Sequence, residues 1–68
     1  MNHRRVQIRD YERHTWIDAI FPALKKGTVF RLFEPDGTPI KNTNGQTWLL
    51  AVADAEMVDG VWQVRILN

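Results

Sequence analysis

The side chains that could carry chemistry in this chain are few. The 68 residues include no cysteine and no serine, which excludes a thiolate zinc site and a cysteine or serine nucleophile. The two histidines, His3 and His14, do not have a spacing typical of metal ligands. The four glycines are isolated turn residues and form no phosphate-binding loop. We therefore expect a protein that is not an enzyme and that uses no cofactor and no metal.

The carboxylates lie in two groups. Glu34 and Asp36 follow one apolar run, and Asp54, Glu56 and Asp59 surround a turn further along. Carboxylates can act as acid and base, or hold a hard cation, only where folding brings them together. Nothing in these spacings requires that, so we expect solvated acidic loops.

Basic charge is concentrated at the N-terminus. Residues 1–14 carry a net charge of +2, and residues 15–68 a net charge of −1. Guanidinium groups gathered in this way can contact phosphates, so the candidate nucleic-acid-binding residues are Arg4, Arg5, Arg9 and Arg13. We interpret residues 1–14 as a basic arm. It is either a flexible, solvated tail or a short strand, because Val6 and Ile8 alternate with polar residues.

Arginine also neighbours aromatic residues further along the chain, at Phe30-Arg31 and between Trp62 and Arg65. Such an arrangement on a sheet can stack nucleic-acid bases. Core packing explains the same aromatic residues better, because a chain this short needs its large side chains in the core. We expect Arg31 and Arg65 to mark the solvent face of their strands.

One helix is predicted, over residues 15–21. Thr15 can cap its N-terminus, and the helix dipole favours Asp18 in the first turn. Trp16 and Ile20 are four residues apart, as on one face of a helix. Pro22 then ends or kinks the helix, because it lacks an amide hydrogen and disfavours helical geometry at the residue before it.

Three strands are predicted after the helix, over residues 28–34, 47–53 and 61–67, which are rich in β-branched and aromatic residues. Asp59-Gly60 is a two-residue hairpin signal, because a type I′ turn needs positive φ at both positions. That turn places Met57 opposite Trp62. Alternate apolar residues stand at even-numbered positions up to residue 52 and at odd-numbered positions after it. One regular strand cannot turn both sets to the same face, so we expect a bulge or break near residues 52–56.

The predicted fold is α+β: a short N-terminal helix across one face of a three-stranded antiparallel meander. Residues 15–68 form this single domain, and the basic arm precedes it. The alternative is a small open SH3-like barrel, in which residues 5–9 and 38–41 add short strands. We expect much of the core to consist of the largest side chains, Trp16, Trp48, Trp62, Phe21, Phe30 and Phe33.

Residues 24–39, LKKGTVFRLFEPDGTP, combine a lysine-glycine turn, an apolar strand and a Glu-Pro-Asp-Gly turn. In these features the chain resembles small uncharacterised proteins of bacteria and their prophages. The resemblance covers about a quarter of the chain and brings no catalytic residue with it. It implies a bacterial or phage setting without a defined activity.

Our first functional hypothesis is a small non-enzymatic interaction protein, such as a phage or prophage accessory or structural component. The open edges of a three-stranded sheet can pair with a protein partner or with a second copy. The alternative is a nucleic-acid-binding domain that uses the basic arm. No apolar leader opens the chain, and no apolar run is long enough for a membrane helix. We therefore expect no membrane partner and a location in the cytoplasm or in a phage particle.

Overall fold

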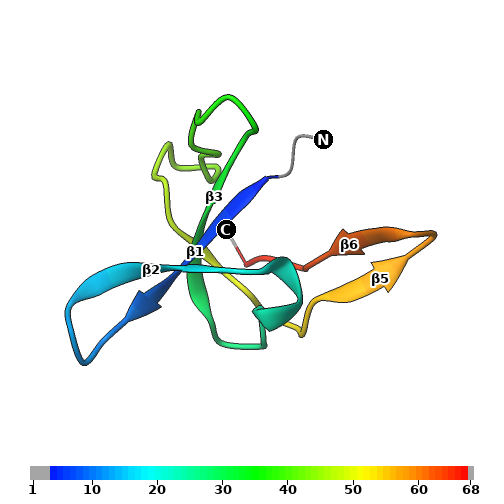
Figure 1. Cartoon of the computed structure of the whole chain (residues 1–68), viewed down its shortest axis with the longest axis horizontal. Helices are drawn as coiled ribbons and strands as arrows, with labels where there is room; N and C mark the ends of the chain where they lie inside the picture. Colours follow the sequence, from blue (N-terminus) through cyan, green and yellow to red (C-terminus); the bar gives the residue numbers. More distant parts are fainter. Residues whose placement is uncertain (1–3, 68) are drawn as a thin grey trace.

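The computed structural model describes residues 4–67, which form two antiparallel β-sheets (Figure 1). The larger sheet has the strand order β2-β1-β3-β4, and the smaller one is a hairpin of β5 and β6. The elements are β1 Arg5–Asp10, β2 Thr15–Ala19, the 3₁₀ turn η1 Phe21–Ala23, β3 Val29–Phe33, β4 Leu49–Leu50, β5 Glu56–Val58 and β6 Val61–Gln63. His3 and the start of the expected basic arm lie outside the described residues.

The predicted helix over residues 15–21 is wrong, and with it the α+β class. Residues 15–19 form the strand β2, which pairs with β1 so that Ile17 lies opposite Ile8. In the turn between these strands, Asp10 Oδ1 accepts the amide hydrogens of two residues of the turn. Threonine, tryptophan and isoleucine suit an extended strand. The only helical turn at this point is the 3₁₀ turn η1, which contains Pro22, because proline cannot continue an α-helical hydrogen-bond ladder.

The N-terminal segment forms one of the two inner strands of the larger sheet. The sequence left open whether residues 5–9 form a tail or a strand. The structure shows a strand, β1, which lies between β2 and β3. Val6 faces Ala19 on one neighbour and Leu32 on the other. The side chains of this basic segment therefore alternate between the two faces of the sheet.

The core lies on one face of the larger sheet. Its buried residues within the described chain are Val6, Leu24, Phe30, Leu32, Leu49 and Ala51. Of the six aromatic residues expected there, only Phe30 is fully buried, and Trp48 and Trp62 remain 38% and 37% exposed. Trp16 and Phe33 lie on the opposite face, because the strand alternation turns them away from the side of Val6 and Leu32.

The predicted three-stranded meander is also wrong. β3 confirms the strand expected over residues 28–34. The strand expected over residues 47–53 is shortened to β4 and a bridge at Ala51, and that over residues 61–67 to β6 and a bridge at Ile66. After β6 the chain returns to the larger sheet at residues 65–67. There Ile66 bridges to Ala51, and Leu67 N donates to Leu50 O at 3.0 Å. Residues 52–55 lie outside any strand, which confirms the predicted break and separates β5 and β6 from the larger sheet.

The hairpin of β5 and β6 confirms the predicted two-residue turn. Asp59 and Gly60 have φ values of 51° and 80°, and Met57 lies opposite Trp62. The hairpin extends away from the larger sheet (Figure 1), and each residue of its two strands is exposed.

Candidate functional site

The outer face of the larger sheet, opposite the core, carries arginine and aromatic side chains. Because side chains alternate along a strand, those of β1 next to the core-facing Val6 and Ile8 point to this outer face. The strand register adds the β2 and β3 residues that lie directly opposite them. We call this set the arginine–aromatic face: Arg5, Gln7, Arg9, Trp16, Asp18, Arg31 and Phe33.

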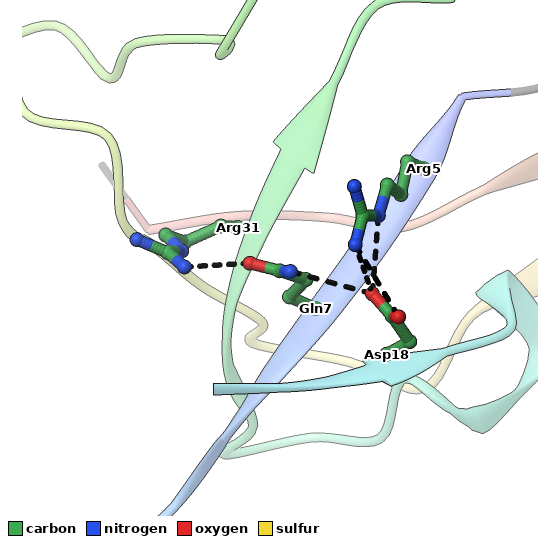
Figure 2. A network of polar contacts seen from close by, with 4 residues as sticks. All are labelled: Arg5, Gln7, Asp18 and Arg31. Atoms are coloured by element: carbon green, nitrogen blue, oxygen red, sulfur yellow. Dashed lines mark hydrogen bonds and ion pairs between the residues drawn. The ribbon is translucent and has the colours of Figure 1, made fainter. Parts of the chain in front are cut away.

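Four of these residues form a polar network across three strands (Figure 2). Arg5 Nε donates to Asp18 Oδ1 at 3.1 Å, and Gln7 Nε2 donates to the same oxygen at 3.3 Å. Arg31 Nη2 donates to Gln7 Oε1 at 2.6 Å. The amide of Gln7 is therefore oriented from both sides. The hydrogen bond from Gln7, followed by that from Arg5, lowers the pKa of the Asp18 carboxyl below its ordinary value.

Arg31 lies between two aromatic rings. Its guanidinium carbon is 4.4 Å from the centroid of Trp16 and 5.7 Å from that of Phe33. Arg9 also lies over Trp16, at 5.4 Å. These distances are within the range of cation–π attraction. Arg31 Nε is buried and has no hydrogen-bond partner, so the hydrogen bond to Gln7 leaves part of this guanidinium unsatisfied.

The structure separates the four arginines predicted from the sequence to bind nucleic acid. Arg5 and Arg9 lie on the arginine–aromatic face. Arg4 is 3.6 Å from Glu34, and Arg13, in the turn after β1, is 3.8 Å from Asp10. They do not form one mobile arm, since β1 holds two of them in the middle of the sheet.

Sequence reasoning left Trp16 and Phe33 out of the candidate site and considered Arg31 only as a supporting contact. The sequence did indicate where Arg31 lies. Arg31 alternates with the core residues Phe30 and Leu32, which predicts a place on the solvent face of the strand. Trp16 was missed because it was assigned to a helix. Only the pairing of β2 with β1 places Trp16 opposite Arg9.

A second surface lies where β2 ends and approaches the tip of the β5–β6 hairpin. It is an open groove of about 870 Å³. Its apolar wall consists of Ala19, Ile20, Phe21, Val61 and Trp62, and the charged residues at its rim include Arg5 and Asp18. We call it the edge groove. Ile20 and Val61 are 70% and 58% exposed, so large apolar side chains line a surface that is open to solvent.

The larger sheet has one uncovered edge among residues 4–67. At the β4 side, residues 65–67 add backbone hydrogen bonds, including Val52 N to Arg65 O at 3.0 Å. At the other side, β2 pairs only with β1. The outer edge of β2 therefore presents backbone groups that a further strand can pair with.

The carboxylates of the two acidic loops have local structural partners. Asp36 Oδ1 accepts the amide hydrogen of Thr38 at 2.9 Å, and this bond lowers the pKa of Asp36. Asp54 Oδ1 accepts the amide hydrogen of Lys26, also at 2.9 Å. Within residues 4–67 no three histidine, aspartate or glutamate side chains come together in a way that could hold a metal ion. No helix in this part of the chain is long and apolar enough to cross a bilayer.

The chain matches no protein-family model, no curated protein and no solved structure. Its function is therefore inferred from its own surfaces.

Proposed function

We propose that this protein is a small, non-enzymatic interaction module that joins to a second copy of itself along the outer edge of β2. The observation that supports this most directly is the uncovered edge of β2 next to the edge groove. Strand addition to such an edge is a common mode of protein association, in which backbone hydrogen bonds supply affinity and side chains supply specificity.

The sequence of β2 is complementary to itself in an antiparallel pair. With the two-fold axis at Ile17, this residue faces Ile17 of the second copy, and Trp16 faces Asp18 of the second copy. Ile17 is 39% exposed at the border of the core side, so the isoleucine pair extends the apolar side of the sheet. On the other side, each Asp18 comes next to the Trp16 ring that Arg9 and Arg31 cover. The negative carboxylate of Asp18 therefore comes close to the positive guanidinium groups of Arg9 and Arg31.

The same register brings a large apolar side chain toward the edge groove. Beyond β2, Ile20 comes opposite His14 of the second copy. The turn that contains Tyr11, which is 66% exposed, thereby comes alongside the groove. Burial of Tyr11 and Ile20 adds a hydrophobic contribution to the backbone pairing.

Sedimentation equilibrium over a range of concentrations tests the proposal. The wild-type chain should approach twice its mass of 8.0 kDa, and Ile17→Lys should remain monomeric, because two ammonium groups then face each other. Ile66→Lys is the matched control. Ile66 is 41% exposed, similar to Ile17, but lies at the opposite side of the sheet, so this variant should still form dimers. Circular dichroism verifies that each variant is folded.

A mixing experiment tests the register itself. Ile17→Lys and Ile17→Glu should each be monomeric alone and should form a heterodimer when mixed, because position 17 faces its own counterpart. A wild-type chain that stays monomeric at high concentration contradicts the proposal. So does a mixture that stays monomeric while wild type dimerises, because the contact then lies elsewhere.

A further inference from the structure

The arginine–aromatic face has guanidinium groups in excess over carboxylates. Among residues 4–67, its only carboxylate is Asp18, which Arg5 already engages at 3.0 Å. Arg9 and Arg31 lie within 4.0 Å of no carboxylate oxygen in that range, and they contact aromatic rings and the Gln7 amide. Two cations on this face are therefore available to an anionic ligand.

The aromatic residues add a second recognition element. Trp16 and Phe33 are half-buried and lie on the solvent side of the sheet, away from the core. Together with the guanidinium plane of Arg31 between them, they form a surface of stacked π-systems. Flat aromatic and guanidinium surfaces stack on nucleobases, and neighbouring cations contact the phosphates that link them.

The dimensions of the face suit an extended strand of nucleotides. From Arg5, opposite Phe33, to Arg9, opposite Trp16, the face runs four residues along β1, about 13 Å at 3.3 Å per residue. A duplex keeps its bases paired and inside, whereas a single strand can present them to the rings. Stacking together with cations therefore favours the single strand.

We propose that the arginine–aromatic face binds single-stranded nucleic acid, with bases stacked on Trp16 and Phe33 and phosphates held by Arg9 and Arg31. This function goes beyond self-association and does not depend on it, because all the binding residues belong to one copy. In the proposed dimer, Asp18 of the second copy lies beside the Trp16 ring and competes with a phosphate for Arg9 and Arg31. It also differs from binding through a basic arm, because Arg13 and Arg4 take no part in it.

Fluorescence anisotropy with a labelled thymidine oligonucleotide of about ten residues tests the proposal at low salt. The affinity should fall as salt rises, because phosphate contacts release counterions. Arg9→Gln and Arg31→Gln should weaken binding and each reduce the slope of log K against log salt by about 0.7. Arg13→Gln and Arg65→Gln are matched controls outside the face and should leave the affinity within about twofold of wild type.

Stacking is tested separately. Trp16→Leu and Phe33→Leu keep an apolar side chain and should each lower the affinity by about fivefold to a hundredfold, in line with the loss of one stacked base. The monomeric Ile17→Lys variant should bind at least as tightly per chain as wild type, because without a dimer no Asp18 of a second copy lies beside Trp16. A loss of binding in this variant would mean that the face needs the dimer.

Three results would overturn the proposal. The first is the absence of binding at low salt. The second is equal loss in Arg13→Gln and Arg9→Gln, which would indicate unspecific attraction of a polyanion. The third is unchanged binding in Trp16→Leu and Phe33→Leu, or equal affinity for a duplex of the same length, which would exclude stacking of single-stranded bases.

Discussion

Asp18 shows how a single exposed carboxylate can organise one face of a sheet. It accepts hydrogen bonds from Arg5 and Gln7, and Gln7 in turn accepts one from Arg31 (Figure 2). In the first turn of the predicted helix, it would have lain near the amide hydrogens of its own segment. In the strand, its partners come instead from the neighbouring β1, at positions 11 and 13 residues away.

The stability of the protein should depend on pH through Asp18. Its pKa is lowered from 3.8 in the folded state by Gln7 and then Arg5, so the unfolded chain binds more protons between the two values. Asp18 therefore stabilises the fold above about pH 4, and this contribution is lost as pH falls through the lowered pKa. Denaturation of Asp18→Asn should show a smaller free energy of unfolding than wild type at pH 7, and the difference should shrink as pH falls below 3.8 and through the lowered pKa.

The control for this pH dependence is a titration of the Asp18 carboxyl by NMR. The wild-type pKa should lie below 3.8, and Gln7→Ala should raise it, because the largest lowering interaction is removed. A wild-type Asp18 that titrates at or above its ordinary pKa would contradict the network.

Among residues 4–67, Asn42 is the one buried polar residue, with 7% of its surface exposed. Its Oδ1 accepts the amide hydrogens of Asn44 and Gln46 at 2.9 and 3.0 Å, and its Nδ2 donates to Trp48 O at 3.1 Å. Asn42→Ala should reduce the free energy of unfolding by about 1–3 kcal/mol, because these buried groups lose their partners. Asn42→Asp keeps the acceptor, but it buries a carboxylate that faces Trp48 O in place of the donor, so urea denaturation near neutral pH should show it to be at least as unstable as the alanine variant.

At the scale of elements, the sequence predicted best where the signal was local. The Asp59-Gly60 turn, its register and the strand β3 followed from neighbouring residues alone. The segment over residues 15–21 was mistaken for a helix because Thr15, Asp18 and the spacing of its apolar residues satisfy helix rules equally well. What decides its structure is long-range pairing with β1, which the sequence of the segment does not contain.

The β5–β6 hairpin depends on its turn, because its strand residues are exposed and bury little surface. Gly60 has a φ of 80°, so Gly60→Ala should destabilise the hairpin by about 1 kcal/mol. Asp59→Asn is the matched control and should be neutral, since asparagine adopts positive φ readily. Amide exchange should accelerate within the hairpin of Gly60→Ala while the protection of β1 and β3 stays close to that of wild type. Equal acceleration throughout would mean that the hairpin and the larger sheet unfold as one unit.

At the scale of the whole molecule, the candidate site was predicted only in part. Arg5 and Arg9 were identified by their charge, but their partners Trp16, Arg31 and Phe33 come from two other strands. The sequence placed the aromatic residues in the core because a short chain needs apolar burial. The structure instead fills the core largely with aliphatic residues and leaves Ile20, Val61 and Trp62 at the surface. That exposed apolar surface supports the interaction module that the uncovered edge of β2 indicates most directly.

If the chain pairs with itself, its thermal stability must depend on its concentration. A dimer of folded chains is favoured by mass action, so each tenfold increase above the dissociation constant adds about 0.7 kcal/mol per chain, half of the 1.4 kcal/mol of one decade. For 68 residues, with an unfolding entropy of about 2.1 cal/mol/K per residue, this corresponds to a rise in Tm of about 5 °C per decade. Ile66→Lys should keep this dependence, whereas Ile17→Lys should melt at one temperature at all concentrations. A wild-type Tm that does not change over two decades of concentration would contradict pairing along β2. It would also contradict the proposal that Tyr11 of a second copy covers the edge groove.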